Sequence, residues 1–211
     1  MIFDCDGVLV DSETLSNQVL AEAITAAGWS MDGVQARQMF VGGTLAAVAS
    51  AVEAKLGKRL PATWIEDYES LRNDAFRREL KAVPGVEDAL ESLLAHGVEM
   101  CVASQGRLEK IALSLRLTRL DRFFEGRMFS AYGVARAKPA PDLFLHAASS
   151  LGCPPETCLV VEDTVLGVKA AVAAGMPVLA FAAQSDPADL QAAGGQVFMD
   201  MAELPGLLGL A

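Results

Sequence analysis

Short apolar runs bounded by polar or turn residues recur along the chain, at residues 1–3, 98–103, 158–161 and 177–181. Runs of this length and composition are typical of parallel strands that are covered on both faces. Between them, leucine and alanine recur at helical spacing, at residues 86–96, 142–151 and 165–174, and a glycine follows each segment. The alternation of strands and helices predicts an α/β fold with a doubly wound parallel sheet.

The stretch from residue 14 to residue 80 departs from this alternation, because it contains no convincing strand. Helical patterns cover residues 15–27, 44–56 and 62–80, and the first two end at Gly28 and Gly57. Glycine at such a position commonly ends a helix. Helices without strands, inserted directly after the first strand, indicate an all-helical cap domain at residues 14–80. The core domain would then consist of residues 1–13 and 81–211.

Composition limits the class of partner. The chain has 211 residues, of which 52% are hydrophobic, and a formal net charge of −10. Such an acidic surface repels nucleic-acid phosphates and anionic lipids, so we expect neither nucleic acid nor a membrane as a partner. The first residues lack the basic and apolar pattern of a secretion signal, and the four cysteines lack zinc spacing. We expect a monomeric cytoplasmic protein with free thiols.

Polar residues suited to phosphate chemistry stand at the ends of three predicted strands. Asp4 and Asp6 follow the first strand, Ser104 ends the second, and Glu162 and Asp163 follow the third. Ligands of an open parallel sheet bind beyond the carboxyl ends of its strands. We therefore expect these side chains to face one crevice.

A phosphomonoester in this crevice would need a nucleophile, an acid and positive charge. Asp4 could attack phosphorus, and Asp6 could protonate the leaving oxygen and later activate water. Mg²⁺ would allow the anions to approach each other, because it prefers oxygen ligands. Asp4 and Asp163 could hold this cation, and Glu162 could hold it or orient its waters. Lys138, on a loop stiffened by two prolines, would supply further positive charge.

Backbone and hydroxyl donors would complete a phosphate site. Gly7 permits a tight turn, so that its N–H and that of its neighbour can face the phosphate. Ser104, followed by Gln105, offers a hydroxyl and backbone N–H groups near a helix start. The two histidines are not expected to act as bases: His96 closes a helix, where a cationic ring is favourable, and His146 lies within a helix and packs.

Four segments of the chain resemble, in the correct order, the four motifs of the haloacid dehalogenase superfamily: DCDGVLVDS, VASQG, AKPAPDLF and VVEDTVLGVKAAVAAGM. The helical insertion is similar to the small cap of the phosphoglycolate phosphatase and β-phosphoglucomutase branch. The resemblance implies a Rossmann-like core, with Asp4 as nucleophile and Asp6 as acid and base. It also implies Ser104 and Lys138 on the phosphate, and Asp163 and the Asp6 main-chain carbonyl on Mg²⁺.

The expected activity is Mg²⁺-dependent hydrolysis of a small phosphomonoester through an aspartyl phosphate. The region around Lys138 resembles bacterial sugar-phosphate phosphatases, including those for 6-phosphogluconate. A β-phosphoglucomutase-like mutase is the alternative with the same core residues. However, residues 40–45 lack the arginine of that pattern, and Ser104 is followed by Gln-Gly where mutases carry lysine–asparagine. Both departures favour hydrolysis.

Two further classes are less favoured. A non-catalytic protein that binds a phosphorylated ligand would be expected to have lost Asp4, Asp6, Lys138 or Asp163, and all four are present. A dehalogenase is excluded by the resemblance, because that branch lacks the second acid and needs no magnesium.

Substrate selection is expected to depend on the cap domain. Gly42 and Gly43 would lie on a cap loop facing the crevice. Because glycine has no side chain, this loop would leave room for a polyhydroxylated substrate.

Overall fold

The chain folds into two compact units. The structure, a computed structural model, describes residues 1–40 and 43–210. One unit combines Met1–Asp11 with Lys81–Ala211, and the other is Ser12–Leu80.

The first unit contains a six-stranded parallel sheet in the order β3-β2-β1-β4-β5-β6. Its strands are β1 (Ile2–Phe3), β2 (Cys101–Ser104), β3 (Met128–Ser130), β4 (Val160–Glu162), β5 (Val178–Phe181) and β6 (Gln196–Phe198). From the central β1 the chain proceeds outward to β2 and β3, then returns and proceeds to β4, β5 and β6 on the other side. The direction of winding therefore reverses beside β1, which is where ligands of open parallel sheets bind.

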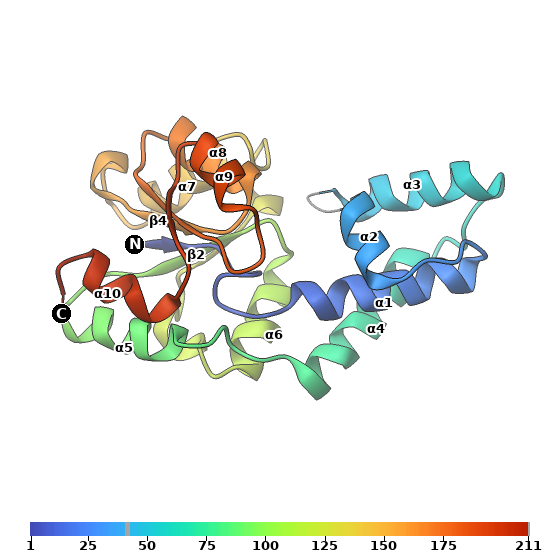
Figure 1. Ribbon diagram of the computed structural model, residues 1–211, viewed down its shortest axis with the longest axis horizontal. Coiled ribbons are helices and arrows are strands. Elements are labelled where there is room, and N and C mark those ends of the chain that lie inside the picture. Colours follow the sequence, from blue (N-terminus) through green and yellow to red (C-terminus); the bar gives the residue numbers. More distant parts are fainter. Residues whose placement is uncertain (41–42, 211) are drawn as a thin grey trace. The chain divides into compact units, whose positions relative to one another are not determined.

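Helices cover both faces of this sheet, and Figure 1 shows α7, α8 and α9 on one side and α5, α6 and α10 on the other. The α-helices are α5 (Val86–Ala95), α6 (Leu108–Leu117), α7 (Asp142–Ser150), α8 (Val165–Ala173), α9 (Pro187–Ala192) and α10 (Leu204–Leu207). Short 3-10 turns are η1 (Asp121–Phe123), η2 (Ala131–Gly133), η3 (Pro155–Thr157) and η4 (Met201–Glu203). The predicted doubly wound parallel sheet is confirmed.

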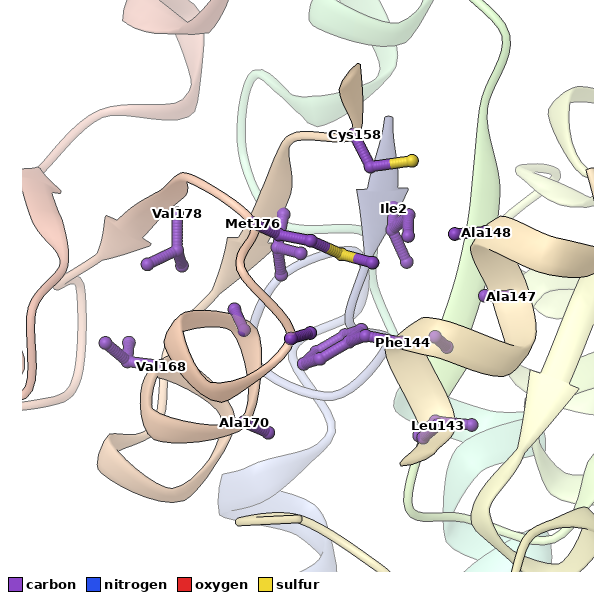
Figure 2. Packing of buried hydrophobic residues seen from close by; sticks show 14 of the residues in the cluster. Ile2, Leu143, Phe144, Ala147, Ala148, Cys158, Val168, Ala170, Met176 and Val178 are labelled. Atoms are coloured by element: carbon purple, nitrogen blue, oxygen red, sulfur yellow. The ribbon is translucent and has the colours of Figure 1, made fainter. Parts of the chain in front are cut away.

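Alternate residues of each central strand enter two different cores, because successive side chains point to opposite faces. Ile2 lies in the core formed with α7 and α8, whereas the Phe3 ring meets the edge of Phe124 with centroids 6.0 Å apart. Figure 2 shows Ile2, Met176 and Phe144 pointing toward one another within the first core. Phe144 is fully buried there, and it also approaches the candidate site described below.

Two strands, β3 and β6, were not predicted from the sequence. Each has three residues and lies at an edge of the sheet, and β3 is only half-buried. An edge strand pairs with another strand on one side only and is less buried than a central strand, so it needs no continuous apolar run. Short segments of this kind cannot be distinguished from loops by their composition.

The second unit contains α1 (Glu13–Ala27), α2 (Gly33–Phe40), α3 (Leu45–Leu56) and α4 (Trp64–Glu79). Gly28 and Gly57 cap the ends of α1 and α3 in the left-handed conformation, as the sequence predicts. The core of this unit includes Ile24, Val52, Trp64 and Tyr68. Helix α2 was missed because it is short and buries only Ala36, so its apolar periodicity is weak.

The cysteines are free thiols, as predicted, although Cys153 is only half-buried while Cys5, Cys101 and Cys158 are buried. Burial raises the pKa of the Cys101 thiol to about 12. Among the described residues, no single helix combines the length and the apolar composition needed to cross a membrane.

Candidate active site

The polar ends of three neighbouring strands lie at one edge of the sheet. Strand β1 pairs in parallel with β2 on one side and with β4 on the other. The backbone N–H of Asp4 continues this pairing, because it donates to the Val161 carbonyl at 2.9 Å. Asp4 therefore lies beside Glu162, which ends β4, and beside Asp163, which follows it; Ser104 ends β2.

Lys138 lies at the centre of this group. Its ammonium donates to Asp4 Oδ1 and to Glu162 Oε1, both at 2.6 Å, and to the Ala103 carbonyl at 3.1 Å. The Lys138 side chain is 1% exposed. Its nitrogen also lies 4.8 Å from the ring centroid of Phe144, a cation–π contact. The predicted loop lysine is thus a buried cation that joins two strand ends.

Glu162 uses both carboxylate oxygens within the protein. Oε1 accepts from Lys138, whereas Oε2 accepts from the backbone N–H groups of Asp163 and Thr164, at 2.9 and 2.8 Å. The Thr164 hydroxyl also donates to Oε2, at 2.9 Å. These donors lie at the N-terminal end of α8, where a negative charge is favourable. Through these contacts Glu162 fixes the position of Lys138, a role that was not predicted from the sequence.

The Glu162 carboxylate fits only because residue 167 is glycine. A Cβ built on Gly167 would overlap both the carboxylate carbon and its oxygens. We expect Gly167→Ala to lower the free energy of unfolding by about 1–3 kcal/mol, as other overpacked core substitutions do. Activity should fall as well, since Glu162 could no longer hold Lys138.

Thermal unfolding of Gly167→Ala should be compared with that of Gly206→Ala. Gly206 is also helical, but a Cβ there would have open space. Equal melting temperatures for the two variants would contradict the close packing of Glu162 against α8.

The turn after β1 is compact. The Gly7 N–H donates to the Val10 carbonyl at 2.9 Å and is therefore engaged within the turn, and a contact of this segment with a phosphate stays a prediction. Glycine is needed here for two reasons. Its φ is +80°, and a Cβ would overlap the carboxylate of Asp163. Gly7 therefore lets Asp163 approach the backbone beside Asp6.

Ser104 is buried at the end of β2, and the loop after it is fastened by hydroxyl groups. The Ser104 Oγ accepts from the Gly106 N–H at 3.2 Å, and the Ser130 hydroxyl donates to the Gly106 carbonyl at 2.6 Å. Gln105 lies in this loop and is half-buried. Their contacts with a phosphate stay predictions.

Lys110 is a site residue that the sequence analysis missed. It lies in the first turn of α6, and its ammonium forms an ion pair with Asp6 Oδ1. One signal was present in the sequence: Lys110 follows Ser104 by six residues, in the helix that begins at the crevice. A lysine in the first turn of a helix is usually exposed to solvent. The sequence pattern does not give the position of this helix relative to the sheet, so it did not identify Lys110 as a site residue.

Negative charge is concentrated at the site. The carboxylates of Asp4, Asp6, Glu162 and Asp163 lie at the ends of neighbouring strands, with the ammonium groups of Lys110 and Lys138 among them. Burial raises the pKa of Asp4 to about 7; Lys138 opposes this rise, and Glu162 and Asp6 add to it. For Lys138, burial lowers the pKa, but Asp4 and Glu162 outweigh it and raise the pKa above its usual value.

A divalent cation fits this donor set. Within residues 1–40 and 43–210, no three side chains of His, Cys, Asp or Glu are grouped as a metal cage. Mg²⁺ does not require one, because it commonly takes one or two carboxylates together with water and substrate phosphate. Asp4 and Asp163 supply carboxylates, and the close approach at Gly7 places Asp163 beside the Asp6 backbone.

The predicted cap-loop residues are only partly described. Gly43 is exposed between α2 and α3, and its N–H donates to the Phe40 carbonyl at 3.0 Å. Gly42 lies outside the described residues, and the role of both in substrate selection stays a prediction. The imidazole of His96 hydrogen-bonds the Ser92 carbonyl, and His146 packs edge-on against Phe129, in agreement with structural roles.

Known proteins are similar to this chain over most of its length. A family model described as haloacid dehalogenase-like hydrolase matches residues 1–181. A 6-phosphogluconate phosphatase from Escherichia coli (strain K12) is 30% identical over 208 residues, which are 98% of this chain and 93% of the relative.

Two solved structures are also similar over nearly their whole length. A HAD family hydrolase from Deinococcus radiodurans R1, with bound phosphate and sodium, is 30% identical, with a TM-score of 0.81 over 99% of this chain and 95% of the other. A Thermotoga maritima protein named as a candidate β-phosphoglucomutase is 25% identical, with a TM-score of 0.83 over 99% and 97%. The predicted enzyme class, a phosphoric monoester hydrolase, is confirmed. The chain belongs to the haloacid dehalogenase-like hydrolase family.

Proposed function

We propose that the chain is a Mg²⁺-dependent phosphatase that hydrolyses a sugar phosphate or sugar-acid phosphate through an aspartyl-phosphate intermediate. The observation that carries this proposal is the buried Lys138 ammonium, which lies 2.6 Å from both Asp4 and Glu162 at the strand ends. A fixed cation beside an acidic nucleophile provides counter-charge to a phosphoryl group before the reaction begins.

The reaction consists of two displacements at phosphorus. A carboxylate oxygen of Asp4 attacks phosphorus in line, and the bond from phosphorus to the substrate oxygen breaks. Asp6 gives its proton to that leaving oxygen, so that a neutral alcohol departs. Asp6 then accepts a proton from water as the water oxygen attacks the aspartyl phosphate. The second displacement releases inorganic phosphate and restores the Asp4 carboxylate.

The other residues hold charge and position. We assign Asp4, Asp163 and the main-chain carbonyl of Asp6 to Mg²⁺, which when bound supplies positive charge to the phosphoryl oxygens. Lys138 provides the second positive charge. Because both Glu162 oxygens already accept hydrogen bonds, we assign Glu162 to positioning Lys138 and no longer to the metal.

The substrate class is supported by the similarity to the Escherichia coli 6-phosphogluconate phosphatase, which extends over 98% of this chain. A β-phosphoglucomutase-like activity is the second candidate, because the similar Thermotoga maritima structure carries that name. We favour hydrolysis because residues 40–45 contain no arginine. The presence of Asp4, Asp6, Lys138 and Asp163 together argues against a protein that only binds a phosphorylated ligand.

Removal of metal should abolish the activity. In a screen of sugar phosphates and sugar-acid phosphates, we expect phosphate release with Mg²⁺, none with an excess of chelator, and recovery when Mg²⁺ is restored. β-Glucose 1-phosphate belongs in the same screen, with glucose 6-phosphate measured alongside phosphate. Formation of the isomer without phosphate release would favour the mutase, and release that persists without metal would contradict the metal assignment.

Several expectations from the sequence stay predictions. They are the monomeric state, the cytoplasmic location, the absence of nucleic-acid and membrane partners, and a substrate-selecting role for the helical unit.

A further inference from the structure

Lys110 adds a second lysine to the site, on a different element from Lys138. The ammonium of Lys110 pairs with Asp6 Oδ1, whereas that of Lys138 pairs with Asp4 and Glu162. The Lys110 side chain is 10% exposed and that of Asp6 is 25% exposed. The pair is therefore shielded from solvent far more than an ordinary surface ion pair, which contributes little.

The aliphatic part of Lys110 is held by the loop that follows β2. A Cβ built on Gly106 would lie 3.2 Å from Lys110 Cδ, so this side chain runs closely along the glycine. Gly106 itself is fixed from both sides, by Ser104 Oγ at 3.2 Å and Ser130 Oγ at 2.6 Å. The Lys110 side chain is thus held at two points, along its aliphatic part by Gly106 and at its ammonium by Asp6.

We propose that Lys110 is a positioning residue for Asp6. By donating to Oδ1, the Lys110 ammonium holds the Asp6 carboxyl group in the orientation from which it gives and takes the transferred proton. A carboxyl group with a free torsion would present either oxygen, and a proton-transfer group must lie within hydrogen-bond reach of its partner to be effective. This inference rests on the proposed function, in which Asp6 is the acid and base.

The inference predicts an effect that depends on the leaving group. A sugar alkoxide is strongly basic and must be protonated as it departs, whereas nitrophenolate departs readily without a proton. The kcat/KM value reports the steps up to the first phosphoryl transfer. Loss of Lys110 should therefore lower kcat/KM much more for a sugar phosphate than for p-nitrophenyl phosphate.

The test compares Lys110→Met with the wild-type enzyme and Mg²⁺ on both substrates. We expect kcat/KM to fall roughly 100-fold for the sugar phosphate and less than about 10-fold for the nitrophenyl ester, since a general acid contributes about 10²–10⁴. Lys110→Arg should recover part of the loss, because a guanidinium can donate to the same oxygen. The affinity for inorganic phosphate, measured by calorimetry, should be unchanged.

Lys169→Met is the matched control, since Lys169 is an exposed lysine on α8, and it should behave as wild type. If Lys110→Met does not fold, Lys110→Gln retains a donor and should show the same difference between substrates to a smaller degree. Equal losses on both substrates together with weaker phosphate binding would overturn the inference and make Lys110 a phosphate ligand. If Lys110→Met is active and its ratio of kcat/KM values for the two substrates equals that of the wild type, the inference is also overturned. A wild-type enzyme inactive on both esters would instead contradict the proposed function itself.

Discussion

Asp4→Asn should lower phosphate release by about 10⁴-fold or more, because an amide cannot form the acyl phosphate and loss of a nucleophile is among the largest single effects known in enzymes. The change keeps the shape of the side chain, and the amide oxygen can still accept the bond from Lys138 that now measures 2.6 Å. It also removes one negative charge that Glu162 and Asp6 repel, since both carboxylates raise the pKa of Asp4. We therefore expect the melting temperature of the metal-free variant to equal or exceed that of the wild type.

The control for this substitution is Asp88→Asn, which removes an exposed carboxylate from the first turn of α5. It should leave the rate unchanged. A second readout is direct: acid-quenched wild-type enzyme should retain labelled phosphate from its substrate, and Asp4→Asn should retain none. Labelling of the Asn variant, or activity near the wild-type level, would show that a different residue is the nucleophile.

The central part of the fold could be predicted from the sequence because burial leaves a strong signal there. Strand β1 and its neighbours β2 and β4 are buried along their whole length, so their residues are apolar up to the polar residues that end β2 and β4. The edge strands β3 and β6 carry no such signal, because one side of each lacks a neighbour in the sheet. Helix α2 has the same difficulty, since Ala36 is its only buried residue.

The candidate site could likewise be predicted only in part. Residues directly at the strand ends, such as Asp4 and Asp163, could be placed because parallel strands end at a common edge. The residues that position these side chains could not be predicted. Gly167 is needed only because the Glu162 carboxylate turns back along α8, and Lys110 matters only because α6 presents its first turn to Asp6. Both depend on the angle at which a helix packs on the sheet, which the pattern of apolar residues does not specify.

Lys138→Met should destabilise the protein and inactivate it. The Lys138 side chain is 1% exposed and its ammonium lies between two buried carboxylates, so its loss would leave Asp4 and Glu162 without their common cation. Stranding a buried charge costs about 3–5 kcal/mol. For a chain of this length that corresponds to a fall of roughly 10 °C in melting temperature. Phosphate release should drop by about 10²–10³-fold or more, as for other groups that stabilise transition-state charge.

The double variant Lys138→Met/Glu162→Gln identifies the source of this instability. If stranded charge is the cause, neutralising Glu162 removes one of the two uncompensated carboxylates, and the double variant should melt above Lys138→Met. Its activity should stay low, because the phosphoryl group still lacks its lysine. Together with the wild type and the single variants Lys138→Met and Glu162→Gln, the double variant gives the coupling free energy between the two residues. A double variant no more stable than Lys138→Met would instead attribute the loss to the packing of Lys138 over Phe144, 4.8 Å away, and the charge argument would fail.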